Sequence, residues 1–269
     1  MNAILELFNY DFFQKAFLAT VFASISCGII GSYIVSRRIV FISGGITHAS
    51  FGGIGLAFLL GFNPLLGAVL FAVLAANGIQ FFTKVAEIRE DSSIAIWWSL
   101  GMALGIIFVF MTPGYTPNLM SYLFGNILTV TSTELWWMFM LNVVIILFFT
   151  FFLRQILYIA FDEEFARTAG LPVNLYNYLI MTLIALTVVL NIRVVGIILI
   201  LSLLTIPQAS ANLFTKDFKK LIVLSSVFAF VGTMIGLFIS YFLDIPSGAA
   251  IIFTLVIMFG LLRGIKALL

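Results

Sequence analysis

The sequence predicts an all-α polytopic membrane protein: one bundle of about 8–9 transmembrane helices, forming a single domain over residues 1–269. Apolar residues make up 63% of the chain and charged residues only 9%, whereas a soluble domain carries roughly a quarter charged residues. Apolar runs of about 20 residues, long enough to cross a bilayer as a helix, follow one another almost from end to end. The strands of a membrane β-barrel would be runs of about ten residues with alternating polarity, and these runs are too long and too continuous for that.

Hydropathy predicts nine membrane spans, of which the second is short and rich in glycine. The sixth and seventh spans can also be interpreted as one broken unit. Two glycine pairs at four-residue spacing, Gly101/Gly105 and Gly232/Gly236, predict close packing of helices. The spans cover roughly residues 15–35, 46–60, 64–83, 92–111, 133–153, 175–191, 194–213, 220–242 and 246–264.

The distribution of basic residues predicts the orientation of the chain, because Lys and Arg favour cytoplasmic loops. If the N-terminus is outside, only Lys15 and Arg193 of the 13 Lys and Arg residues lie outside. Nine spans then place the C-terminus in the cytoplasm. The acidic Glu6 and Asp11 occupy the region where a cleaved signal peptide would be basic, so we expect none.

His48, the single histidine of the chain, lies in the glycine-rich second span, with Gly44 one helical turn before it and Thr47 beside it. If the chain between Arg38 and His48 is helical, the imidazole lies about 15 Å into the membrane, close to its middle. Neutral imidazole is the commonest metal-binding side chain and can also relay protons. A structural histidine, bonded to a carbonyl of a neighbouring helix, is the alternative.

A second polar cluster lies in the seventh span, around Pro207, which is expected to kink the helix. Thr205, Gln208 and Asn212 follow one another at intervals of three and four residues, so they share one helix face. This face either lines a transport pathway or satisfies the carbonyl groups that the proline leaves free.

The segment 161–173 connects two spans on the predicted cytoplasmic side. Asp162, Glu163, Glu164 and Arg167 begin it, and Gly170 ends it shortly before Pro172. A carboxylate near a helix N-terminus suits the helix dipole. We therefore expect a short helix that is presented for docking.

Several functions are excluded by what the sequence does not contain. It has no G-x-x-x-x-G-K-[ST] phosphate loop, and one histidine cannot form H-E-x-x-H. Cys27 is alone, so no disulfide framework or cysteine metal cluster is available. The Lys and Arg residues are dispersed, which argues against nucleic-acid binding. We predict no catalytic residues, no bound cofactor and no enzyme activity in this chain.

Six blocks, in order along nearly the whole chain, resemble the permease subunit of the ATP-binding-cassette (ABC) importers for zinc, manganese or iron. They are RRIVFISGGITHASFGGIGLAF, EDSSIAIWWSLGMALGIIF, NLMSYLFGNILTV with its Leu-Phe-Gly segment, FDEEFARTAGLPV, VVGIILILSLLTIPQASANLF and FLDIPSGAAIIF.

The resemblance implies a homodimeric permease in a prokaryotic cytoplasmic (inner) membrane, with a divalent metal as substrate. Two separate cytoplasmic ABC ATPase subunits would hydrolyse ATP, and an extracytoplasmic metal-binding protein would deliver the metal. His48 becomes the candidate metal ligand, with Gly44, Thr47, Thr205, Gln208 and Asn212 as pathway candidates. The segment 161–173 becomes a coupling helix that inserts into the ATPase through Asp162, Glu163, Glu164, Arg167, Ala169 and Gly170.

The chain departs from the family pattern at two positions. Members assigned to zinc or manganese typically carry an aspartate where this chain has Gly44, and Asn126 replaces an acid that is frequent there. Two imidazoles without carboxylates favour borderline cations such as Zn²⁺ over Mn²⁺. The small residues around His48 are expected to let the two protomers approach, so that both copies of His48 reach a shared pathway.

Two other transport functions compete with this interpretation. A permease for a metal chelate, such as a siderophore or cobalamin, shares the general scheme. A secondary transporter would use His48 as a proton relay and would need no ATPase.

Overall fold

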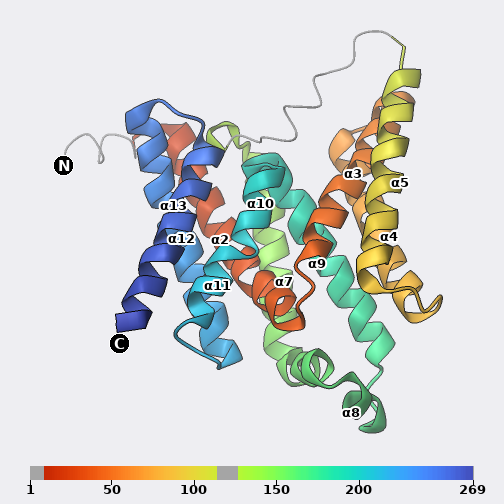
Figure 1. Ribbon diagram of the computed structural model, residues 1–269. Coiled ribbons are helices and arrows are strands. Elements are labelled where there is room, and N and C mark those ends of the chain that lie inside the picture. The colour runs from red at the N-terminus through yellow and green to blue at the C-terminus, as the bar shows by residue number, and fades with distance from the viewer. Residues whose placement is uncertain (1–8, 114–126, 269) are drawn as a thin grey trace. The chain divides into compact units, whose positions relative to one another are not determined.

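The computed structural model describes residues 9–113 and 127–268, and within these ranges the regular structure is entirely helical (Figure 1). Eight of the described helices are long and apolar enough to cross a membrane, which confirms the all-α polytopic fold. They are α2 (Asp11–Arg37), α3 (Phe41–Leu60), α4 (Pro64–Lys84), α5 (Glu90–Met111), α7 (Ser132–Phe161), α9 (Val173–Val195), α12 (Phe218–Leu243) and α13 (Ser247–Leu268). The shorter elements are η1 (Ile127–Thr129), α8 (Glu163–Thr168), α10 (Ile197–Leu203) and α11 (Ile206–Asn212).

The chain folds into two compact units. The first comprises the described residues within 1–36, 120–147 and 190–269, and the second those within 37–119 and 148–189. The chain therefore passes from one unit to the other within helices α2, α7 and α9.

In the second unit, α3 packs against both α4 and α5, and glycines permit the close approach (Figure 1). A Cβ atom on Gly53 would lie 1.9 Å from the carbonyl oxygen of Gly67 in α4. One on Gly101 of α5 would lie 2.4 Å from the Cα atom of Ala49. Because no side chain fits at these contacts, only glycine allows the helix backbones to touch.

In the first unit, α12 packs against α13 in the same way. A Cβ atom on Gly236 would lie 2.4 Å from the Cα atom of Ile251, and one on Gly232 would lie 2.4 Å from a methyl group of Leu255. The close packing predicted from the two glycine pairs is confirmed at both helix contacts.

Helix α3 begins at Phe41, five residues before the predicted start of the second span. Arg38 has a positive φ of 62° and turns the chain between α2 and α3, so the segment from Arg38 to His48 is not continuously helical. His48 lies about 10 Å along α3, at 1.5 Å per residue, so the predicted depth of about 15 Å can no longer be argued from a continuous helix that starts at Arg38.

The seventh predicted span is broken into α10 and α11. The break falls at Leu204 and Thr205, and Pro207 lies in the first turn of α11. A proline in the first helical turn costs no hydrogen bond, since the backbone N–H there has no partner within the helix. The interruption predicted around Pro207 is confirmed: the helix breaks just before the proline, which lies in the first turn of a new helix.

Candidate metal pathway and coupling helix

The imidazole of His48 lies flat against the indole of Trp98, which α5 presents to α3. The ring centroids are 4.2 Å apart and the ring planes are inclined by only 9°. His48 is partly buried, and its Nδ1 atom is buried without a hydrogen-bond partner among the residues that the structure describes. The bond to a neighbouring carbonyl that a structural histidine would make is not seen at this nitrogen, which is left with its lone pair or proton unused.

The neighbours of His48 on α3 add no charge. Gly44, one turn earlier, is buried, and the buried Thr47 hydroxyl donates a hydrogen bond of 2.6 Å to the carbonyl oxygen of Ser43. Over residues 9–113 and 127–268, no group of three or more His, Cys, Asp or Glu side chains could hold a metal ion. The described part of the chain therefore supplies His48 as a candidate ligand without a group of partners, and a complete site needs further ligands.

The small residues around His48 face helices of the same chain. A Cβ atom on Gly45 would lie 2.6 Å from Cγ2 of Ile94 in α5, and one on Gly52 would lie 2.8 Å from the ring of Phe71 in α4. These glycines make room for intrachain packing. The expectation that they serve the approach of two protomers is wrong for these positions.

Gln208, a pathway candidate, is fully buried in the first unit. Its Nε2 atom donates hydrogen bonds to the carbonyl oxygens of Cys27 (2.8 Å) and Leu203 (3.1 Å). Gly31 makes room for this amide, because a Cβ atom there would lie 2.3 Å from Nε2. The amide thus satisfies the Leu203 carbonyl at the helix break, one of the two roles that the sequence left open, and it also bonds a carbonyl of α2.

The other two pathway candidates are only partly buried. The Thr205 hydroxyl bonds the carbonyl oxygen of Leu201 at 2.6 Å, and the carbonyl oxygen of Asn212 accepts a bond from Lys216 at 3.3 Å. Thr205, Gln208 and Asn212 belong to the first unit and His48 to the second. The structure does not bring these two candidate sets together within one unit.

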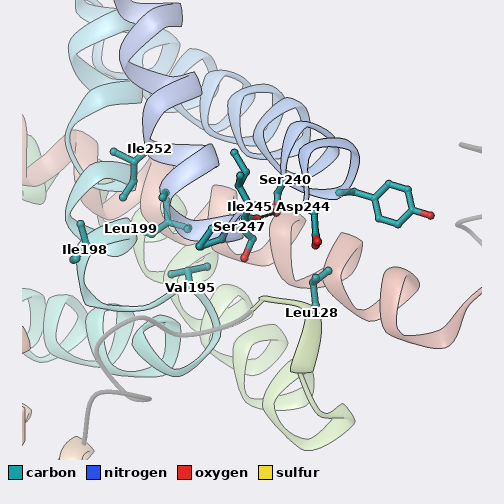
Figure 2. A pocket seen from close by; sticks show the side chains of 13 residues that line it. Leu128, Val195, Ile198, Leu199, Ser240, Asp244, Ile245, Ser247 and Ile252 are labelled. Atoms are coloured by element: carbon teal, nitrogen blue, oxygen red, sulfur yellow. Dashed lines mark hydrogen bonds between the residues drawn. The ribbon is translucent and has the colours of Figure 1, made fainter.

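The first unit contains a cavity of about 750 Å³ between the N-terminal part of α10 and the connection from α12 to α13 (Figure 2). Val195, Ile198 and Leu199 form one side. Asp244 and Ser240 lie on the other, where the Ser240 hydroxyl donates a hydrogen bond of 2.6 Å to the carbonyl oxygen of Ile245. With one carboxylate among its lining residues, this cavity does not offer a metal-binding set.

Helix α8 lies in the segment predicted to be a coupling helix, and local interactions define both of its ends. The Asp162 side chain accepts a hydrogen bond of 2.9 Å from the backbone N–H of Phe165, as an N-cap does. Gly170 has φ 79°, a left-handed conformation that suits glycine, and it reverses the chain after the helix. Ala166 is buried with Ile159 and Val173 in a small apolar cluster.

Glu163 points inward from α8, and its side chain is 17% exposed. Its carboxylate accepts hydrogen bonds from Lys84 at 2.7 and 2.8 Å and from Arg167 at 3.0 Å, and Arg37 lies 3.8 Å away. Burial alone would raise the pKa of this carboxyl group. The hydrogen bonds from Lys84 and Arg167 and the nearby positive charges outweigh burial, so the pKa of Glu163 is lowered.

The outward face of α8 is formed by exposed polar and aromatic side chains. Glu164, Arg167, Thr168, Ala169 and Gly170 are all exposed. Phe165 is 52% exposed and meets the ring of Tyr158 edge to face, with centroids 5.7 Å apart. Aromatic side chains with this exposure are typical anchors of protein interfaces.

Sequence reasoning missed four residues of these two sites: Trp98, Lys84, Arg37 and Phe165. The signal for Phe165 in the sequence was an aromatic residue within a segment rich in charged residues. The signal for Lys84 and Arg37 was their position at the ends of spans on the same predicted side as Glu163. Asn126, most of the segment around Leu-Phe-Gly and the Arg193 side chain lie outside the described residues.

Eight long apolar helices in the described part of the chain, with a short capped helix between two of them, define a polytopic membrane protein. The profile of the ABC 3 transport family matches residues 9–263, so the chain belongs to this family, whose members are the permease subunits of ABC importers for metals. The resemblance seen in the sequence is confirmed.

Individual relatives match over nearly the full length. The chain is 36% identical to the manganese transport system membrane protein MntC of Listeria monocytogenes, with 94% of this chain and 90% of that protein covered. It is 40% identical, over the same shares, to the uncharacterized membrane protein slr2045 of Synechocystis. Its fold is similar to a chain in the structure of PsaBC from Streptococcus pneumoniae in complex with Fab, with a TM-score of 0.83, 34% identity and coverage of 96% and 95%.

Proposed function

We propose that this chain is the membrane pathway through which an ABC importer moves Mn²⁺ into the cytoplasm. The observation that carries the proposal is the 36% identity to a manganese transport membrane protein over 94% of the chain. The orphaned Nδ1 of His48 supports it, because imidazole nitrogen binds divalent first-row metals.

The pathway needs ligands that one chain does not supply. A homodimer would bring a second His48 to a shared pathway and offer two imidazoles. Few ligands give a weak site, which suits transport because a bound ion has to leave again. Thr47, Thr205, Gln208, Asn212 and the backbone at Gly44 remain candidates for lining the pathway.

Zn²⁺ is the second candidate, favoured by one specific feature. Gly44 stands where a carboxylate would complete an Asp/His pair, and imidazole without carboxylate suits borderline cations better than the harder Mn²⁺. The relatives' names and the chemistry of the site thus point to different metals.

Energy would come from two ATPase subunits that bind the outward face of α8, and an extracytoplasmic binding protein would deliver the metal. The exposed Phe165, Glu164 and Arg167 support a docking role for α8. The gathering of Arg37, Lys84 and Arg167 around this helix supports a cytoplasmic location, since basic residues favour that side. The N-terminus would then be outside and the C-terminus inside.

Reconstitution tests the proposal directly. The permease, its ATPase and its binding protein are assembled in proteoliposomes, and ATP-dependent uptake of Mn²⁺, Zn²⁺ and Fe²⁺ is measured singly and in competition. We expect Mn²⁺ uptake that stops when the ATPase is omitted or ATP is withheld. Preferential Zn²⁺ uptake would select the second candidate. Uptake of the metal only as an organic chelate, or uptake independent of ATP, would overturn the proposal.

A further inference from the structure

Helix α8 is too short to be stable by itself. It has six residues, whereas isolated helices below about 12 residues are marginal in water. Its position therefore depends on the contacts that hold it. The N-cap at Asp162 and the turn at Gly170 shape the helix, but they lie within the same segment and do not fix it to the rest of the unit.

Apolar contacts of Ala166 and Phe165 hold α8 against α7 and α9. The polar contacts that join α8 to α2 and α4 centre on the carboxylate of Glu163. Lys84 is the last residue of α4 and reaches this carboxylate with two hydrogen bonds, at 2.7 and 2.8 Å. Arg37 is the last residue of α2 and lies 3.8 Å from it. Arg37 also donates a 2.8 Å hydrogen bond to the carbonyl oxygen of Ile159, near the end of α7. The Glu163 carboxylate thus joins α8 to the ends of α2 and α4, and Arg37 in turn bonds the end of α7.

The ion pairs between Glu163 and the basic residues Lys84 and Arg37 are expected to be strong, for two reasons. Hydrogen bonds between ionised partners are shorter and stronger than neutral ones, and partial burial reduces screening by solvent. Neither Lys84 nor Arg37 opposes a helix dipole, because positive charge is favoured at helix C-termini. Glu90 at the start of α5 also interacts electrostatically with Arg37 and Lys84, which offsets the excess positive charge.

The junction leads toward the candidate metal ligand. Helix α4, which carries Lys84, packs directly against α3, which carries His48. At Gly53 and Gly67 the two helix backbones are in direct contact, with no room for a side chain between them. A displacement of α8 by a docked partner would therefore move the end of α4 and, with it, α3.

We propose that Glu163 is a positioning residue that links the docking helix α8 to α4, so that ATPase movement reaches the helix that carries His48. This inference rests on the proposed function for its direction, but the link itself is a property of the permease alone. Glu163 acts through Lys84 and Arg37 and not by touching the ATPase.

The link is tested first without any partner. Spin labels on Val85→Cys, just after α4, and Thr168→Cys, at the end of α8, are placed in a Cys27→Ser background, and their distance distribution is measured by pulsed electron resonance. We expect a narrow distribution for the parent protein and a broad one for Glu163→Gln. Glu164→Gln, which removes the adjacent exposed carboxylate, is the matched control and should leave the distribution narrow. Equal widths for Glu163→Gln and the control would overturn the proposal.

The functional consequence is tested in the reconstituted importer. Glu163→Gln should keep ATP hydrolysis while metal uptake per ATP falls several-fold, and Lys84→Gln should cause a comparable loss, because Lys84 makes two of the hydrogen bonds to the Glu163 carboxylate. Effects of Glu163→Gln and Lys84→Gln that simply add in the double variant would contradict a shared link. If the labels show the broadening but the parent complex transports no metal, the link stands and the proposed function fails.

Discussion

His48 and Trp98 form a parallel ring stack, with centroids 4.2 Å apart, between helices that are joined by backbone contact at Ala49 and Gly101. The stack holds the imidazole ring parallel to the indole, which restricts the directions in which its nitrogens can bind an ion. An indole face beside an imidazole also favours positive charge on that ring or on an ion bound to it. Trp98 therefore orients the candidate ligand.

Trp98→Ala should raise the metal concentration that gives half-maximal uptake by about 2–10-fold, since an aromatic pair is worth about 0.5–1.5 kcal/mol. Trp98→Phe keeps a ring in place and should lose less. Uptake rates over a range of metal concentrations measure the effect. Trp136→Ala is the control, because Trp136 is also an exposed tryptophan but lies in the first unit, whereas Trp98 lies in the second. Equal effects of Trp98→Ala and Trp136→Ala would show that the stack has no role in transport.

Gly44→Asp should tighten metal binding and shift preference from Zn²⁺ toward Mn²⁺. The new carboxylate would lie one helical turn before His48, and carboxylate oxygen suits harder cations. Competition binding of the two metals to the purified permease measures the shift. Gly45→Asp is the matched comparison and should impair folding, because its side chain would meet Ile94. A well-assembled Gly44→Asp protein with unchanged metal preference would show that position 44 does not face the ion.

The sequence predicted the membrane spans well because each is a long apolar run that has to bury its backbone polar groups in helical hydrogen bonds. The prediction of helix ends was less accurate, because hydropathy does not determine where a helix begins or ends. Helix α7 is kinked at Phe152 (φ −110°, ψ 18°), next to the predicted end at residue 153, and a further helical segment with Arg154 and Gln155 extends it to Phe161. Helix α3 starts early because the turn at Arg38 precedes it.

Gly170→Leu should weaken ATPase coupling by distorting the end of α8. A side chain in the left-handed conformation costs about 1–2 kcal/mol, whereas asparagine tolerates that conformation better. Substrate-stimulated ATP hydrolysis of the assembled complex should fall for Gly170→Leu and remain near the parent value for Gly170→Asn. Full stimulation in Gly170→Leu would argue against a coupling role for this turn.

Cysteines at Ser132 and Thr168 should be labelled from opposite sides of the membrane by an impermeant thiol reagent, in a Cys27→Ser background. Both positions are exposed, at the start of α7 and in α8. The bias of Lys and Arg places Ser132 outside and Thr168 in the cytoplasm. Right-side-out and inverted vesicles, labelled separately, give the sidedness. Labelling of both cysteines from the same side would contradict the proposed orientation.

The candidate sites were predicted only in part, because the missing members come from distant parts of the chain. The single histidine drew attention to position 48, but nothing in local periodicity pairs it with Trp98, 50 residues later. Likewise, three acids in one segment suggested a charged docking helix, yet only the fold shows that Glu163 turns inward to Lys84 while Glu164 turns outward. Gln208 was found for its polarity, but local sequence does not show that its amide bonds Cys27 in α2 as well as Leu203 before the helix break.

The role of His48 is tested most directly by ATP-dependent uptake of radioactive manganese into proteoliposomes that contain the assembled importer with His48→Ala. We predict that uptake is abolished while assembly with the ATPase and basal ATP hydrolysis are retained. The substitution removes a candidate ligand, and the buried Nδ1 makes no hydrogen bond to the described residues that would be lost with it. Manganese uptake that instead stays proportional to the amount of assembled His48→Ala complex would contradict the account.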